Sequence, residues 1–258
     1  MDLHIAGKTA IVCASSRGLG KACATSLAGE GVHVFINGRS EESLAECEQE
    51  IRAAGGEVTA VVADVSTAEG RQKLLDACPA PDILVNNNGG PSPVGFADSK
   101  REDWNAAIEA NMMAPIELIQ AVLPGMRERG FGRIVNITSA MVKSPNPIMC
   151  VSSATRTAVT ALSKAVSKEV VADNVTINNL LPGAHATDRI DALDRSGAEK
   201  AGEDLEAFIA KKQAGIPAGR YGTAEDFGAA CAFLCSQYAG YMVGQNVLLD
   251  GGGINATL

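Results

Sequence analysis

The feature that most limits the fold is a regular alternation of short apolar runs with longer helical stretches. Seven runs are predicted to be strands, at 9–13, 32–36, 58–63, 83–85, 133–138, 175–181 and 246–249. Helical patterns lie at 21–30, 41–54, 71–77, 103–129 (interrupted at Pro115), 153–173 and 224–236. Strict alternation implies a parallel sheet covered on both faces by right-handed crossovers. The sequence therefore predicts an α/β fold, a doubly wound parallel sheet of about seven strands in a single domain.

In such sheets, ligands bind outside the carboxyl ends of the strands. The loops that follow the strands are 14–20, 37–40, 64–66, 86–91, 138–144 and 182–190. We therefore expect the binding site to be built from these loops.

Composition excludes several classes of function. The net charge is −8 and no Lys/Arg cluster is present, which argues against a nucleic-acid partner. No apolar run approaches the roughly 18–20 residues of a membrane span, and the N-terminus lacks a signal-peptide pattern. The cysteines are scattered, and Cys231 and Cys235 lack further metal ligands nearby in the sequence. We expect a cytoplasmic protein that binds a small molecule and no metal.

A glycine-rich turn, C-A-S-S-R-G-L-G, joins the first strand to the first helix. Glycines there let the backbone approach a pyrophosphate, and the helix N-terminus supplies N–H donors and partial positive charge. The candidate cofactor contacts are Ala14, Ser16, Arg17, Gly18, Leu19 and Gly20. Ala14 stands where a first glycine is expected, and its Cβ would reduce cofactor affinity. A tight structural turn is the alternative interpretation.

The end of the second strand indicates which dinucleotide binds. An acid usually takes the adenosine ribose hydroxyls of NAD at this point, but the sequence here is N-G-R-S, with no acid before Glu41. Arg39 can pair with a 2′-phosphate, and Arg17 can assist it, because a guanidinium binds phosphate in a bidentate manner. The pattern favours NADP(H) over NAD(H). The alternative is that Arg39 is a solvated surface charge.

Seven short motifs then stand in order along nearly the whole chain. They are Gly18-Leu19-Gly20, Asp64-Val65, Asn86-Asn87-Asn88-Gly89, Asn111, Ser139, Pro182-Gly183 with Thr187, and the closing G-Q-N-V-L-L-D-G-G. In this order the sequence resembles a classical short-chain dehydrogenase/reductase of the 3-oxoacyl-[acyl-carrier-protein] reductase-like branch. The resemblance implies a Rossmann-type fold and an NAD(P)-dependent oxidoreductase.

The resemblance also implies roles for individual residues. The cofactor would be contacted by Asp64, Val65, Asn86, Asn87, Asn88, Gly89, Pro182, Gly183 and Thr187. A catalytic Ser–Tyr–Lys–Asn tetrad is implied as well, and Ser139 and Asn111 match it. The family forms dimers or tetramers through its long helices, so a homodimer or homotetramer is expected.

Two tetrad positions depart from the family. Counting on from Ser139 places Ser152 at the tyrosine position and Arg156 at the lysine position. A serine hydroxyl is a much poorer acid than a phenol with a pKa near 10, and a guanidinium hardly deprotonates. The usual proton transfer cannot be carried over. Arg156 can still donate to the nicotinamide ribose, so cofactor binding can survive.

Three interpretations remain open. In the first, another acid is recruited: Lys143 leads and His185 follows, whereas Tyr221, Tyr238 and Tyr241 look structural. In the second, an activated carbonyl or other C=X substrate needs little acid catalysis. In the third, the protein is a catalytically inactive NADP(H)-binding sensor or partner subunit. The segment 184–215 is too long for a plain connection, so we expect a substrate lid there.

Overall fold

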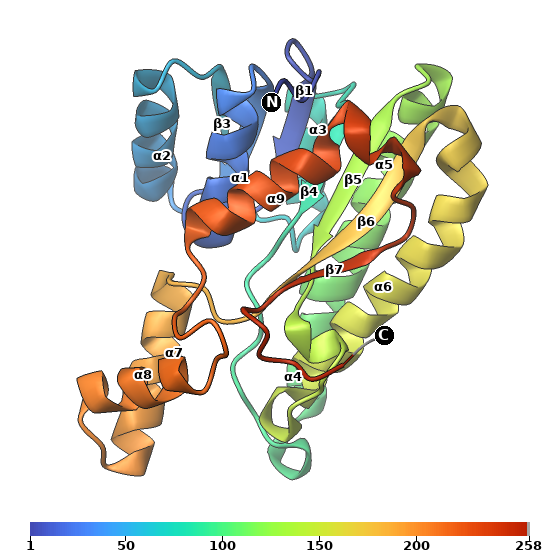
Figure 1. Ribbon diagram of the computed structural model, residues 1–258. Coiled ribbons are helices and arrows are strands. Elements are labelled where there is room, and N and C mark those ends of the chain that lie inside the picture. The colour runs from blue at the N-terminus through green and yellow to red at the C-terminus, as the bar shows by residue number, and fades with distance from the viewer. Residues whose placement is uncertain (257–258) are drawn as a thin grey trace.

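The computed structural model, which describes residues 1–256, contains one parallel sheet of seven strands in the order β3-β2-β1-β4-β5-β6-β7 (Figure 1). The strands are β1 (Thr9–Val12), β2 (His33–Gly38), β3 (Val58–Val62), β4 (Ile83–Asn86), β5 (Gly132–Ile137), β6 (Val175–Pro182) and β7 (Asn246–Leu249). The central strand β1 pairs with β2 on one side and β4 on the other. The α/β fold class and the seven predicted strands are thus confirmed.

The helices occupy the connections between the strands. They are α1 (Gly18–Gly29), α2 (Glu41–Ala53), α3 (Ala68–Ala77), α4 (Arg101–Ile108), α5 (Ala114–Glu128), α6 (Cys150–Val170), α7 (Asp188–Ala201), α8 (Leu205–Ala214) and α9 (Ala224–Cys235). A π-helical turn, Glu109–Met113, joins α4 to α5. The sequence predicts an interruption at Pro115, but the structure has it just before this residue, in the π-helical turn, and Pro115 is the second residue of α5.

Both faces of the sheet are buried, because successive residues of a strand point to opposite faces. Ala10 and Val12 of β1 pack in a core with α1, α2 and α9. Ile11 and Cys13 pack in a second core with α3, α5 and α6. This two-sided burial explains why the strands read as continuous apolar runs.

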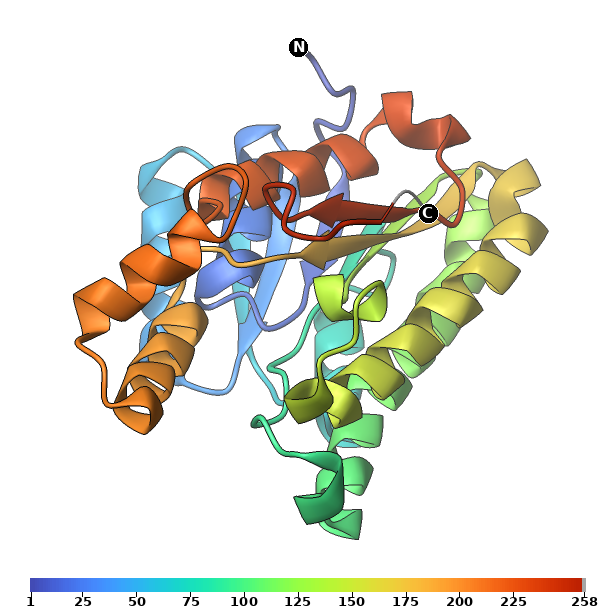
Figure 2. The same ribbon diagram turned by 60° about the horizontal axis from the view of Figure 1, so that its bottom comes forward.

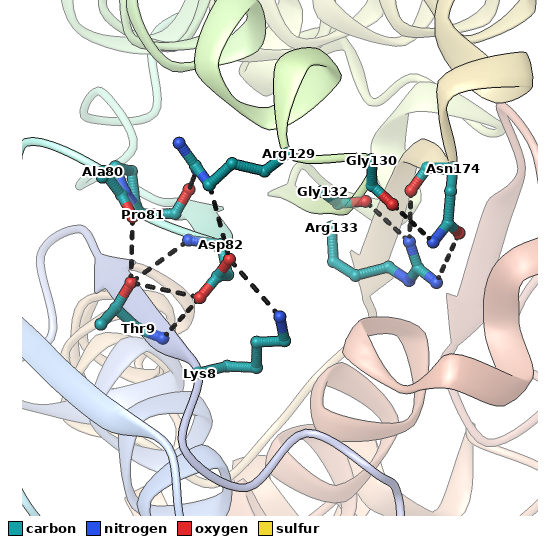
Figure 3. A network of polar contacts seen from close by, with 10 residues as sticks. All are labelled: Lys8, Thr9, Ala80, Pro81, Asp82, Arg129, Gly130, Gly132, Arg133 and Asn174. Carbon is teal, nitrogen blue, oxygen red and sulfur yellow. Dashed lines mark hydrogen bonds and ion pairs between the residues drawn. The ribbon is translucent and has the colours of Figure 1, made fainter.

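Figure 3 shows a polar network at the amino ends of the strands, opposite the predicted site. Asp82, just before β4, accepts a hydrogen bond from Thr9 N at 3.1 Å. The fully buried Arg133 donates to the carbonyls of Gly132 and Asn174, each at 2.9 Å. Burial lowers the pKa of Arg133, so these carbonyls offset part of the cost of burying its charge. The network joins β1, β4, β5 and the turn before β6.

The stretch Arg101–Glu128 is long and apolar enough to cross a membrane by length and composition alone, although only 33% of its most apolar window is buried. The same test is passed by core helices of soluble proteins. Here the π-helical turn interrupts the stretch, and Leu118, Val122 and Met126 pack into the second core.

The segment 184–215 contains two helices, α7 and α8, that the sequence pattern does not predict. In Figures 1 and 2 this orange pair stands to one side of the sheet. Its centre is the fully buried Asp194, which pairs with Lys212 of α8 and accepts a hydrogen bond from the Tyr221 hydroxyl at 2.8 Å. Burial and the Asp194 carboxylate raise the pKa of Tyr221. Tyr221 is therefore a structural residue here and a poor proton donor.

Candidate active site

A narrow cavity of about 20 Å³ lies between the loop after β4, the end of β5 and helix α6. Asn86, Asn111, Thr138 and Arg156 line it. Within residues 1–256, the Asn86 Oδ1, Asn111 Oδ1 and Thr138 Oγ1 atoms are buried without a hydrogen-bond partner. Unpaired buried polar atoms are costly. The cavity is therefore suited to polar atoms of a water molecule or a ligand.

Asn111 lies within the π-helical turn Glu109–Met113. Such turns leave a backbone carbonyl free and recur at functional sites. The Ala110 carbonyl accepts a hydrogen bond from Asn88 Nδ2 at 3.2 Å, and Asn111 Nδ2 donates to the Gly89 carbonyl at 3.4 Å. The turn thereby fixes the loop after β4 against the helix.

The glycine-rich turn leads into α1 as predicted. A side chain on Gly20 would overlap the Ala14 carbonyl oxygen, so only glycine fits there. Gly18 has φ +58°, and an ideal Cβ placed on it would lie 3.9 Å from the methyl group of Thr187. Leu19 packs against the first core instead of facing outward. The turn and the segment after β6 therefore face each other across the sheet edge.

The helices at this edge differ in whether a side chain caps their N-terminus. α2 and α3 begin with Ser40 and Thr67, whose hydroxyls accept hydrogen bonds from the first turn. At α1 and α7, as at α6, the first-turn N–H groups donate to no N-cap side chain; the N-cap residues of α1 and α7 are Arg17 and Thr187. Uncapped helix N-termini favour anions. Thr187 and Arg17 thus stand at two N-termini that can bind phosphate groups.

Ala14 adopts φ +45°, in the left-handed region that favours glycine. The conformation is held by Asn37 of β2, whose Oδ1 accepts from Ala14 N at 2.8 Å and whose Nδ2 donates to the Ala63 carbonyl at 2.7 Å. Asn87 Nδ2 donates to the Ala14 carbonyl at 3.2 Å. Asn37 was not among the predicted site residues. The only indication of its role in the sequence was that an amide side chain directly follows the apolar run 32–36.

Arg39 lies where the sequence places it, at the end of β2 and largely exposed. Its nearest charged partner is Asp64, at 3.9 Å between Nη1 and Oδ2. Burial acts to raise the pKa of Asp64, but hydrogen bonds from Ser66 and the Arg39 charge outweigh it and lower that pKa. Ser16 Oγ lies 3.0 Å from an ideal Gly38 Cβ, so the glycine-rich turn adjoins this site.

The loop after β6 lies tightly against β7. Gly183 N donates to the Leu249 carbonyl at 2.7 Å, and a Cβ on Gly183 would overlap the Asp250 backbone. Pro182 pairs with Leu249 in the sheet. On the other side of the sheet edge, Val65 lines the narrow cavity.

Arg156 is buried in α6 and bonds only to backbone carbonyls among the described residues. Its Nη1 donates to Ile137 and Thr138 at 2.8 and 3.0 Å, and its Nη2 donates to Asn88 at 3.3 Å. Burial lowers the pKa of Arg156 to about 10, and the nearby charge of Arg189 adds to this effect. Arg189 is a second residue that the predicted site omitted, since it stood within a segment with no predicted structure.

The other candidate catalytic residues, Ser139, Ser152 and Lys143, lie in or near the loop that joins β5 to α6. Ser139 follows β5, and its Oγ accepts from Met141 N at 3.1 Å. Ser152 is buried in the first turn of α6. Lys143 is half-buried in the loop between them, and residues 1–256 offer its ammonium neither an ion pair nor a hydrogen bond.

His185 lines a different cavity, of about 160 Å³, together with Arg220, Asp226 and Asp250. Its ring packs edge-on against Phe227, with centroids 5.2 Å apart. Burial lowers the pKa of His185, although the Gly183 carbonyl and Asp226 oppose this. The structure therefore does not bring His185 to the cavity lined by Asn111 and Arg156.

Comparison with known proteins agrees with this geometry. The family model for short chain dehydrogenases matches residues 8–196. The chain belongs to the short-chain dehydrogenase family, whose members are oxidoreductases.

Particular relatives include an NADPH-dependent reductase, BacG, from Bacillus subtilis, 32% identical over 96% of this chain and 98% of that protein. A 3-oxoacyl-[acyl-carrier-protein] reductase from Synechocystis is 34% identical over 96% of this chain and 97% of its own length. The structure of L-sorbose reductase from Gluconobacter frateurii, complexed with NADPH and L-sorbose, superposes with a TM-score of 0.94. It is 30% identical and covers 99% of this chain and 100% of that chain.

Proposed function

We propose that this protein is an NADP(H)-dependent oxidoreductase that reduces a small carbonyl or activated C=X substrate with a non-standard proton relay. The observation that carries the proposal is a set of anion-binding groups at the sheet edge, beside a narrow polar cavity lined by Arg156. Two uncapped helix starts and an exposed arginine would provide the nucleotide site, and Arg156 lines the narrow cavity. NADPH-dependent relatives support the same cofactor.

The residues fit the dinucleotide. Arg39 and Arg17 would hold the 2′-phosphate, and the starts of α1 and α7 would hold the pyrophosphate. Asp64 and Val65 would contact the adenine, and Asn87, Asn88 and Gly89 would border the adenosine. Pro182, Gly183 and Thr187 would border the nicotinamide, whose bound reduced form supplies a hydride. Gly20 lets the turn close against α1, since a side chain there would overlap the Ala14 carbonyl oxygen.

In this proposal Ser152 and Arg156 replace the tyrosine and lysine of the usual relay. Arg156 holds the loops after β4 and β5 together through their carbonyls, and one of its two remaining N–H groups would donate to the nicotinamide ribose. Its fixed positive charge stabilises a developing alkoxide. Ser139 orients the substrate oxygen, and Asn111 keeps the cavity polar.

The proton would come from Lys143. Its ammonium has no partner within the described residues, and it projects from the loop between Ser139 and Ser152. His185 is the weaker candidate because it lines the separate cavity and is packed against Phe227.

In the same proposal α7 and α8 form the substrate lid, and the protein acts in the cytoplasm as a homodimer or homotetramer.

The test couples cofactor binding with turnover. NADPH oxidation is followed by absorbance against a panel of carbonyl compounds, and NADPH binding is measured by calorimetry. Lys143→Ala is expected to lower kcat at least about tenfold with little change in the Kd of NADPH, since general acids contribute about 10²-fold or more. Lys168→Ala, on the exposed side of α6, serves as the charge-matched control.

Each outcome has a distinct meaning. Full turnover by Lys143→Ala removes Lys143 as the acid. NADPH binding without turnover of any substrate contradicts the reductase and favours the sensor. Gain of ketone reduction by the double variant Ser152→Tyr and Arg156→Lys indicates that only the proton relay differs from that of the family.

A further inference from the structure

Two arginine side chains approach one point at the mouth of the candidate site. An ideal Cβ on Gly90 would lie 3.6 Å from Arg156 Nη2 and 3.8 Å from Arg189 Nη2. Arg156 comes from α6 and Arg189 from the first turn of α7. Because Gly90 has no side chain, the space between the two guanidinium groups is open on the side of this residue.

Neither arginine is neutralised by an acid within residues 1–256. Arg156 donates only to backbone carbonyls, and Arg189 Nη2 donates to the Pro91 carbonyl at 2.8 Å. The acid next to Arg189 in the sequence, Asp188, lies 3.9 Å from Arg17 instead. Two cations therefore face each other with no counter-charge, although the chain as a whole carries a net charge of −8.

This arrangement has an electrostatic cost that an anion would remove. Burial lowers the pKa of Arg156 to about 10, and the charge of Arg189 acts in the same direction. Like charges close together destabilise each other, most strongly where solvent is excluded. An anion held between them would gain charge-assisted hydrogen bonds from both sides.

We propose that Arg156 and Arg189 form a carboxylate-binding subsite at Gly90, so that the substrate is a carbonyl compound bearing a carboxylate. This inference rests on the proposed reductase function. A carboxylate fits because one Nη2 of each arginine lies beside Gly90. Each Nη2 donates one hydrogen to a backbone carbonyl and keeps a second for one carboxylate oxygen. Three of the N–H groups of Arg156 already bond to carbonyls, which leaves few donors for a larger anion.

The experiment compares oxo acids with their methyl esters. Pyruvate, acetoacetate and levulinate, each beside its methyl ester, are assayed for NADPH oxidation and for binding to the NADPH-loaded protein by calorimetry. The variants are Arg189→Gln and Gly90→Ala. The alanine methyl would make ordinary van der Waals contacts at 3.6 and 3.8 Å, so it fills the subsite without disturbing the fold. Arg195→Gln, an exposed residue of the same helix, is the charge-matched control.

The wild-type protein is expected to bind at least one oxo acid about tenfold more tightly than its ester, as loss of a charge-assisted hydrogen bond implies. Arg189→Gln and Gly90→Ala should abolish this preference, and Arg195→Gln should retain it. Equal binding of acids and esters by the wild type would overturn the subsite, as would a preference that survives both variants.

The two proposals fail in different ways. Turnover of esters or neutral ketones with no preference for acids keeps the reductase and rejects the subsite. Carboxylate binding that depends on Arg189, with no turnover of any compound, keeps the subsite and rejects the reductase.

Discussion

The cofactor preference is expected to depend on a single exposed side chain, Arg39. In the structure its guanidinium is 80% exposed and lies 3.9 Å from Asp64. An exposed ion pair of this kind contributes about 0–1 kcal/mol. Releasing Arg39 from Asp64 to bind a phosphate is therefore inexpensive.

The gain on binding is larger. A hydrogen bond to a charged group contributes about 1.5–3 kcal/mol, and the 2′-phosphate would receive at least one from Arg39. Subtracting about 0.5 kcal/mol for the lost pair, the middle of its range, leaves about 1–2.5 kcal/mol. Since about 1.4 kcal/mol corresponds to a factor of ten, Arg39→Ala should raise the Kd of NADPH roughly 5- to 70-fold. The Kd of NADH, which has no 2′-phosphate, should change little.

The assay is calorimetric titration of both cofactors against wild type and variant. Arg52→Ala, an exposed arginine that pairs with Glu48 on α2, removes the same charge away from the site and serves as control. An unchanged Kd for NADPH, or an equal rise for NADPH and NADH, would refute the assignment of Arg39 to the 2′-phosphate.

Three further predictions concern stability. Arg133→Met should lower the free energy of unfolding by about 3 kcal/mol, because buried carbonyls lose their donor; a loss below about 0.5 kcal/mol in urea would contradict this. Ala14→Gly should raise it by about 1 kcal/mol by removing the left-handed alanine, and should tighten NADPH binding; a lower thermal midpoint would refute the strain. The pKa of His185 is lowered in the fold from an unfolded value of about 6.5, so the unfolded chain binds more protons in acid. Stability should therefore fall as pH drops below about 6.5, and His185→Gln should flatten that part of the profile in urea titrations at different pH values.

Much of the fold was predictable because strands that are buried on both faces of the sheet consist of continuous apolar runs. All seven strands were located from those runs, within one or two residues at each end. Helices α7 and α8 were missed because their stability comes largely from tertiary contacts. The ion pair of Lys212 with the buried Asp194, from the neighbouring helix, has no short-range signal.

The candidate site was predictable where one backbone motif determines it. The glycine-rich turn and the loop after β4 lie where the strand ends place them. Contacts between distant segments were not predictable: Asn37 holding Ala14, and Arg189 meeting Arg156 beside Gly90. The periodicity of apolar residues describes neighbours along one helix or strand, so it gives no information on which side chains from different elements lie close together.

The π-helical turn at Asn111 also constrains how the gene can change. A π-turn holds one residue more than an α-turn, and each helical residue rotates the chain by roughly 100°. Deleting one residue from Glu109–Met113 would therefore restore an ordinary α-helical turn and leave Leu118 and Val122 of α5 facing the sheet, whereas the same deletion within α5 would rotate the residues beyond it by roughly 100°. Single-residue deletions there should therefore survive selection for folding alone and be lost only where the position of Asn111 at the narrow cavity matters.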